Sequence, residues 1–512
     1  MLMRTVLVVT LFVTAAEAGI FHDVLAEKVQ RFRDIKELQI QLNLVLDEYG
    51  QLFDVHTTEV QGLTGNVNLL RQLRSAVQAG ARPDELLQAI SRIFSKLEGL
   101  VDSHPVLATL SRRTYLAFVV LKWMLLGQKS LDDGWEEKLA EIASKFYRLH
   151  VHSAVRKGML EYLHISKSGG TSFSAAAKHS NCSMAPGIGQ LEELGDFPRW
   201  INGTAFEEIT GGTDVMWSYY STKGRPIEGQ TCTRRRAYLQ KFGYNYVSNE
   251  FTLHGGSSER NTHVCPQMFN VVTLRDPASR LASHLHYMLA RVKKRLMGKK
   301  GLDEGKFFDI FCAGDVNVWE RMAPTVIDNY NVRSFIGESG FHMPVGDIGR
   351  EDVEVARRLL LQFDLVLDLD AGSEAVDLAI QQGLGWNLSM FELHVRSSSS
   401  ALSKLNYSKE DCPNHELLQT LRTRQNPDRV LYSTGRTLAL LDGVFLGMAR
   451  ALGLRPGELA AKEAPAGVSA PGDEPGCGLM RPAAAAVVEG ARWGEAAAAR
   501  GDGAKASRNF VT

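Results

Sequence analysis

A short loop of small, hydroxyl and basic residues is the first part of the sequence whose residue types indicate chemistry. The apolar run 160–165 predicts a strand, and the alanine-rich run after residue 172 predicts a helix. Where a strand, a glycine-rich loop and a helix follow one another, the first N–H groups of the helix converge and its dipole favours an anion. The candidate anion-binding residues are Lys167, Ser168, Gly169, Gly170, Thr171 and Ser172.

The loop differs from a Walker A nucleotide-binding loop. That motif places its lysine after the glycines, whereas Lys167 precedes Gly169 and Gly170. Two glycines followed by a threonine would also suit a simple turn between a strand and a helix. The lysine, together with the strand and the helix on either side, therefore carries the prediction of an anion site.

A second predicted strand, 269–274, ends in Arg275, Asp276 and Pro277. Asp276 suits a helix N-cap and Pro277 suits the first helical turn. Arg275 would then lie at the carboxyl end of a strand, where open α/β sheets bind ligands. Ser283 follows eight residues later on the predicted helix, and an arginine with a hydroxyl can hold one phosphate. The alternative is a local ion pair between Arg275 and Asp276.

The two motifs together resemble those of the Golgi carbohydrate sulfotransferases, most of all the heparan sulfate 2-O- and 6-O-sulfotransferase group. The segment 164–171 (HISKSGGT) resembles their 5′-phosphosulfate loop, and 272–280 (VTLRDPASR) resembles their 3′-phosphate motif. The resemblance covers about residues 159–450. It implies a P-loop-like α/β fold and 3′-phosphoadenosine 5′-phosphosulfate (PAPS) as the donor, with no metal.

The same resemblance assigns roles to single residues. Lys167 matches the lysine that contacts the 5′-phosphosulfate, and Arg275 with Ser283 matches the pair that holds the 3′-phosphate. Ser166 stands where many relatives have proline, which predicts a looser start of the loop. Ser168 replaces a frequent threonine and keeps a hydroxyl.

Sulfuryl transfer also requires a base that accepts the proton of the acceptor hydroxyl. Relatives take a His or a Glu from between the two motifs, and here the segment 246–256 offers Glu250 and His254. The unperturbed pKa of an imidazole lies nearer to neutral pH than that of a carboxylate, which favours His254. Glu250 is the alternative, and His263 is a third candidate.

The acceptor is predicted to be a carbohydrate hydroxyl. The basic runs 291–295, 299–300 and 234–236 could hold an anionic polysaccharide, or could simply be solvated faces. One alternative function is a nucleotide-dependent kinase, against which the position of Lys167 counts. Another is a secreted, non-catalytic glycan-binding protein on the same fold. A formal net charge of +0 argues against a general nucleic-acid binder.

The N-terminus predicts entry into the secretory pathway. Residues 1–18 combine a short basic start, an apolar run and an A-x-A-like end, as in a cleaved signal peptide; the alternative is an uncleaved anchor. The protein would then reside in the Golgi lumen or be secreted. The acceptor sites for N-glycosylation are Asn181, Asn202, Asn387 and Asn406.

Composition divides the rest of the chain into three parts. Residues 19–150 predict a helical region that could support oligomerisation, residues 155–454 predict the sulfotransferase domain, and the Ala/Gly/Pro-rich residues 455–512 predict a disordered tail. Strands that alternate with helices in the middle part predict a parallel sheet flanked by helices. If Cys477 lies in a disordered tail, the folded part has an odd number of cysteines, so no disulfide is assigned.

Overall fold

A computed structural model of the chain describes residues 20–58, 105–125, 133–210, 231–254, 262–296, 308–393, 415–463 and 476–480, with residues 127 and 305 and short gaps at 31, 33 and 313–314. The predicted signal peptide and the basic run 299–300 lie outside the described residues. The side chains of the run 291–295 also lie outside them.

The centre of the fold is a four-stranded parallel sheet in the order β2-β1-β3-β4. The strands are β1 (Leu160–Leu163), β2 (Tyr246–Asn249), β3 (Phe269–Leu274) and β4 (Leu365–Asp368). Every residue of these strands is buried, as is typical of parallel sheets that are covered on both faces. The prediction of an α/β fold with a parallel sheet is confirmed, and all four carboxyl ends lie at one edge.

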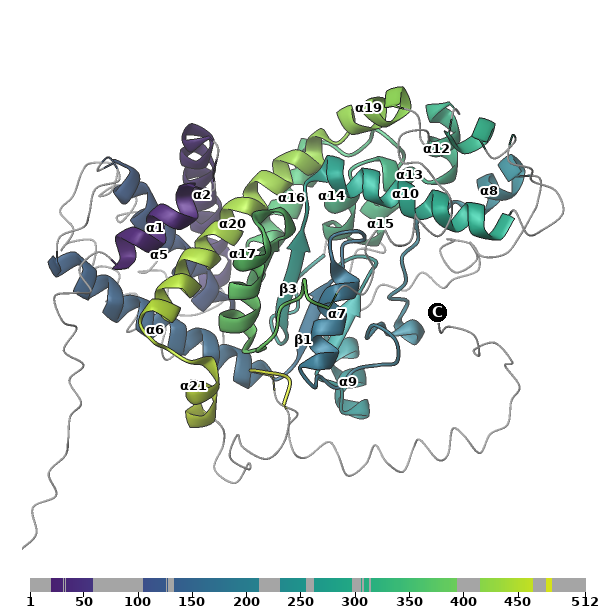
Figure 1. Cartoon of the computed structure of the whole chain (residues 1–512). Coiled ribbons are helices and arrows are strands. Elements are labelled where there is room, and N and C mark those ends of the chain that lie inside the picture. Colours follow the sequence, from purple (N-terminus) through teal and green to yellow (C-terminus); the bar gives the residue numbers. More distant parts are fainter. Residues whose placement is uncertain are drawn as a thin grey trace, which may run out of the picture.

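Helices surround this sheet, and Figure 1 shows α20 running diagonally beside it, with α1 and α2 on one side of α20 and α17 on the other side of α20. The α-helices are α1 (Ile20–Gln30), α2 (Ile35–Thr58), α5 (Pro105–Leu125), α6 (Asp133–Lys157), α7 (Gly170–His179), α8 (Gly203–Thr210), α9 (Cys232–Phe242), α10 (Pro277–Leu296), α12 (Val316–Met322), α13 (Pro324–Ile327), α14 (Tyr330–Phe335), α15 (Gly337–Phe341), α16 (Arg350–Leu360), α17 (Ser373–Leu378), α19 (His415–Thr423), α20 (Asn426–Ala451) and α21 (Pro456–Glu463). Short 3-10 or π turns are η2 (Glu192–Leu194), η3 (Phe308–Cys312), η4 (Leu369–Ala371) and η5 (Ala379–Leu384).

The N-terminal helices belong to the same core as the sheet. Apolar side chains of α1, α2, α5 and α6 form one buried cluster with those of α20 and of all four strands. The predicted boundary between residues 150 and 155 falls inside α6, which continues to Lys157. The described part of residues 19–150 is therefore a layer of the globular core and not a separate stem.

A buried carboxylate on α20 connects this layer to the sheet. Asp442 accepts hydrogen bonds from Arg113 Nη2 at 2.6 Å and from Arg112 Nη2 at 2.7 Å, both on α5. It also accepts one from the backbone N–H of Val366 in β4 at 3.0 Å. Burial by itself raises the pKa of Asp442, but the two guanidinium groups lower it overall.

The tail contains two ordered segments, so the prediction of disorder from residue 455 onward is wrong for them. Helix α21 packs on α6. Further along, Cys477 is fully buried and forms a disulfide with Cys182, and Leu479 N donates to Leu384 O at 2.9 Å. A second disulfide joins Cys232 to Cys265, and Cys312 is disulfide-bonded as well.

No single helix in the described part of the chain is long and apolar enough to cross a membrane. Helices α20 and α21 pass the length and composition test only as a pair, with a bend of 81° between them.

Removing the Asp442 carboxylate is expected to destabilise the fold strongly. Asp442→Ala leaves two buried guanidinium groups without their counter-charge, which should lower the free energy of unfolding by about 3–5 kcal/mol. Urea denaturation followed by circular dichroism measures this. Glu354→Ala is the matched control, because it breaks an exposed pair with Arg350 on α16 and should cost about 0.5 kcal/mol or less. Equal losses for the two variants would contradict the assigned role of Asp442.

Candidate active site

The loop between β1 and α7 has the geometry that its sequence predicts. The strand ends at Leu163, the chain turns through residues 166–169, and α7 begins at Gly170. Lys167 and Gly169 both adopt the left-handed conformation, with φ of 69° and 86°. A positive φ is uncommon for a residue other than glycine and costs free energy. Such conformations cluster at functional sites, so the backbone of Lys167 fits a site residue. Gly170 is needed for a different reason, since a Cβ there would lie 1.8 Å from the His164 ring.

The two motifs identified in the sequence touch each other. Arg275 Nη1, at the carboxyl end of β3, donates to the carbonyl oxygen of Lys167 at 3.2 Å. The Lys167 ammonium lies 4.3 Å from the centroid of the Tyr287 ring on α10. Asp276 caps α10 by accepting from Ser279 N at 2.8 Å, as predicted. Two cations from separate strands thus lie on the same edge of the sheet.

Ser283 lies on α10 and is 9% exposed. Its neighbour His284 is fully buried, and its Nδ1 accepts a hydrogen bond from Arg280 Nη1 at 3.1 Å. Burial, followed by the charges of Arg280 and Lys167, holds the pKa of His284 well below its usual value. His284 is therefore neutral at physiological pH and adds no third charge.

The loop residues differ in their accessibility. Lys167, Gly169, Thr171 and Ser172 are partly exposed, whereas the Ser168 side chain is fully enclosed. A ligand at this loop would meet the lysine, the two later hydroxyls and the N–H groups at the start of α7, whereas the N–H of Ser168 is donated to Ile165 O at 3.1 Å.

Ser166 is the centre of a buried polar cluster, whose hydrogen bonds count against the predicted looser start of the loop. Its hydroxyl donates to Glu250 Oε1 at 2.8 Å and lies 2.9 Å from Tyr330 Oη. Trp200 Nε1 donates to the Ser166 hydroxyl at 3.1 Å, and Gln190 Nε2 donates to Glu250 Oε2 at 2.9 Å. Both carboxylate oxygens of Glu250 are therefore held in place directly beside the lysine-bearing loop. The Glu250 side chain is 13% exposed, so it is not sealed from solvent.

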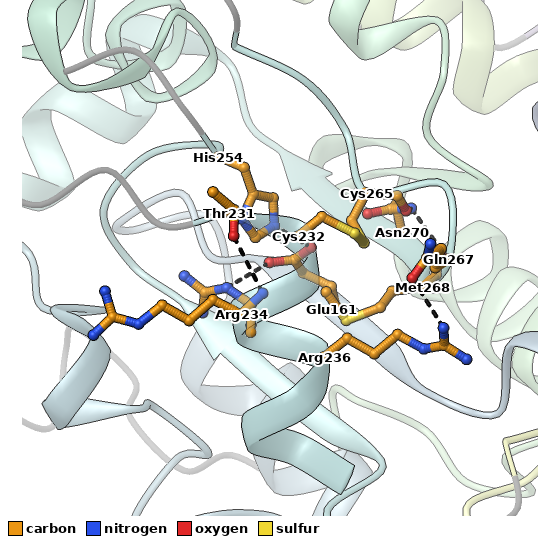
Figure 2. Close-up of a disulfide and its surroundings, with 11 residues drawn as sticks. Glu161, Thr231, Cys232, Arg234, Arg236, His254, Cys265, Gln267, Met268 and Asn270 are labelled. Carbon is orange, nitrogen blue, oxygen red and sulfur yellow. Dashed lines mark hydrogen bonds and ion pairs between the residues drawn. A yellow bond between two sulfur atoms is a disulfide. The ribbon is translucent and has the colours of Figure 1, made fainter. Parts of the chain in front are cut away.

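His254 occupies a different environment (Figure 2), where its ring lies beside the Glu161 carboxylate and near the Cys232–Cys265 disulfide. Its Nε2 is 2.7 Å from Glu161 Oε2, its ring stacks on His263, and it is 1% exposed. Burial raises the pKa of Glu161, but His254 and Arg235 lower it overall. The hydrogen bond and the ring contact of His254 are thus made in a buried ionic cluster, not with the loop.

The same cluster accounts for part of the basic run 234–236. Arg235 is buried, and its Nη1 donates to Asp196 Oδ2 at 2.6 Å. Arg236 Nη1 donates to Gln267 Oε1 at 2.9 Å. Of the three arginines, Arg235 is therefore a structural cation and not part of an acceptor surface.

A cavity of about 730 Å³ adjoins the second motif at the carboxyl ends of β3 and β4. Asp276 and Ser279 line it from α10, and Asp368 and Asp370 line it from the end of β4. Asp370 Oδ2 accepts from Asp276 N at 2.6 Å, so the cavity wall is joined directly to the residue after Arg275. A ligand that contacts Arg275 could therefore extend into this cavity.

The predicted glycosylation sites lie at the surface where the structure describes them. Asn181, Asn202 and Asn387 are exposed. Asn406 lies outside the described residues.

Within the described ranges, no group of three or more His, Cys, Asp or Glu side chains is placed to hold a metal ion. Comparisons of the chain with protein-family models, with curated proteins and with solved structures find no significant match. The function is therefore inferred from the site residues themselves.

Sequence reasoning missed the residues that hold Glu250 in place. Gln190, Trp200 and Tyr330 come from three separate segments, and the sequence alone predicted none of them as a site residue. The one available signal was Ser166, since a hydroxyl in place of proline adds a hydrogen-bonding group next to the lysine.

A methyl group at residue 170 is expected to disrupt the loop. Gly170→Ala would push the added Cβ into the His164 ring, and overpacking of this kind costs about 1–3 kcal/mol. Gly457→Ala is the control, because Gly457 also lies in the first turn of a helix but has no atom near its Cβ position. Thermal unfolding of both variants measures the effect. An equal melting temperature for Gly170→Ala and wild type would show that His164 moves freely.

Proposed function

We propose that this protein is a PAPS-dependent sulfotransferase that transfers a sulfuryl group to a hydroxyl of a carbohydrate acceptor. The observation that carries the proposal is the junction of Lys167 and Arg275, which joins the loop resembling a 5′-phosphosulfate site to the strand end resembling a 3′-phosphate site. A nucleotide with phosphates at both positions requires two such groups at one sheet edge. A P-loop-like fold is part of the same proposal.

Different residues of the chain would have different roles in sulfuryl transfer. Lys167 and the N–H groups at the start of α7 would neutralise the charge that develops on the leaving phosphate. Arg275 and Ser283 would hold the 3′-phosphate and so fix the donor for in-line attack. Thr171 and Ser172 add hydroxyl donors at the helix start.

Glu250 is the proposed general base. Its carboxylate adjoins the loop through Ser166, keeps some exposure to solvent, and is oriented by hydrogen bonds to both of its oxygens. An imidazole has an unperturbed pKa nearer to neutral pH than a carboxylate has, but the His254 ring is hydrogen-bonded to Glu161. Geometry outweighs intrinsic basicity here, because a base must first reach the proton that it accepts.

The proposed compartment is the lumen of the secretory pathway, either the Golgi or the route to secretion. Disulfides such as Cys182–Cys477 persist in oxidising compartments and are rare in the cytosol. Exposed glycosylation sequons at Asn181, Asn202 and Asn387 also support this proposal.

Loss of either cation should weaken binding of the desulfated donor, 3′-phosphoadenosine 5′-phosphate (PAP). Lys167→Ala and Arg275→Ala each remove a charge-assisted contact, which should raise the Kd by about fivefold or more. Isothermal titration calorimetry on the folded variants measures it, and ATP in place of PAP tests for a kinase. Undiminished PAP affinity in both variants, or tighter binding of ATP than of PAP by the wild type, would refute the donor assignment.

The base is tested by two substitutions. Glu250→Gln keeps the shape and removes the basicity, so turnover should fall by about 10²–10⁴-fold while PAP affinity stays nearly unchanged. His254→Ala should lower the melting temperature, because it removes the buried hydrogen bond to Glu161 and leaves that carboxylate with Arg235 alone, yet retain more than about a tenth of the activity while folded. Transfer of labelled sulfate from PAPS to a panel of polysaccharides gives both rates. The reverse pattern would assign the base to His254.

A further inference from the structure

The cavity beside Arg275 has a wall that comes from the N-terminal region. Besides the acidic residues of β4 and α10, it is lined by Phe32, which follows α1, and by Lys28 of α1. Neither residue lies in the segment that resembles the sulfotransferases. Its volume of about 730 Å³ is within the range of small-molecule sites, about 300–1,000 Å³.

Helix α1 is held firmly at this position by α20. Val24 and Lys28 face the glycines of α20, and a Cβ on Gly447 would lie 3.0 Å from the Val24 side chain. Lys28 is 4% exposed, and its ammonium donates to Glu27 Oε1 at 2.7 Å. The close approach of the two helix backbones therefore makes α1 a fixed wall of the cavity.

Aromatic and cationic groups meet at this wall. The Arg436 guanidinium lies 4.7 Å from the centroid of the Phe32 ring and 5.9 Å from that of Tyr432. Arg436 Nε is 3.6 Å from Asp368 Oδ2, and the Tyr432 hydroxyl donates to Asp368 Oδ1 at 2.9 Å. Flat rings and a guanidinium plane, with carboxylate acceptors beside them, suit a planar base that carries an amino group.

A continuous set of contacts links this wall to the proposed phosphate site. Tyr432 Oη also lies 3.2 Å from Asp370 Oδ2, which accepts from the N–H of Asp276, the neighbour of Arg275. A ligand whose phosphate contacts Arg275 would thus direct its nucleoside toward Tyr432, Arg436 and Phe32.

We propose that helix α1 and Phe32 are part of the donor site, and that they close the side of the cavity that receives the purine nucleoside. This inference rests on the proposed function. The N-terminal helices would then be required for donor binding as well as for the core. Lys28 would contribute positive charge near the ligand, and Phe32 would contribute a stacking surface shared with Arg436.

The test uses the full chain and PAP as the probe. Phe32→Leu keeps an apolar side chain but removes the ring, and calorimetry should show a Kd about tenfold higher, since stacking of a base on an aromatic ring has an effect of that order. Phe32→Tyr keeps the ring and should bind PAP within about twofold of wild type. Ile40→Ala is the control, because Ile40 is 65% exposed on α2 and does not line the cavity.

Melting temperatures without ligand separate a binding defect from a folding defect. Phe32→Leu should melt close to wild type without PAP and gain less stability when PAP is added. If the wild type binds PAP and Phe32→Leu binds it with the same Kd, this inference is overturned and the proposed function remains intact. Wild type that does not bind PAP would instead overturn the proposed function.

Discussion

The rest of the structure depends on the buried ion pairs between the Asp442 carboxylate and two arginines. The carboxylate joins two arginines of α5 to the long helix α20, and it also accepts a hydrogen bond from Val366 in β4. One charged group therefore fixes the N-terminal layer, the central helix and a sheet strand relative to each other. Because a buried charge is tolerated only with matched partners, this arrangement has little freedom to shift.

The fixed sheet edge is what gives the candidate site its geometry. Parallel strands place all their carboxyl ends on one side, so the loop after β1 and the strand end of β3 meet although they are far apart in the sequence. Lys167 and Arg275 therefore lie on the same edge of the sheet, joined by the hydrogen bond from the guanidinium to the Lys167 carbonyl oxygen. Burial, followed by the charges of Arg280 and Lys167, lowers the pKa of His284 and keeps its ring neutral, so the imidazole adds no further positive charge there.

The loop is rigid on one side and open on the other. Ser166 faces inward and is held by Trp200, Tyr330 and Glu250, whereas Lys167 and the first turn of α7 keep some exposure. Such a division suits electrostatic catalysis, in which donors must already be oriented before the charge develops.

The sequence by itself determined several local elements: the strand before the glycine loop, the strand before Arg275, the loop itself, the Asp276 cap and the two cations at the strand ends. These follow from periodicity, turn chemistry and capping, which act over a few residues. Only the tertiary structure showed how the surroundings of Glu250 and His254 differ, because Ser166 contacts Glu250 whereas Glu161 contacts His254. It also decided the place of the N-terminal helices and of Cys477, since long-range packing and a disulfide across the chain leave no local signal.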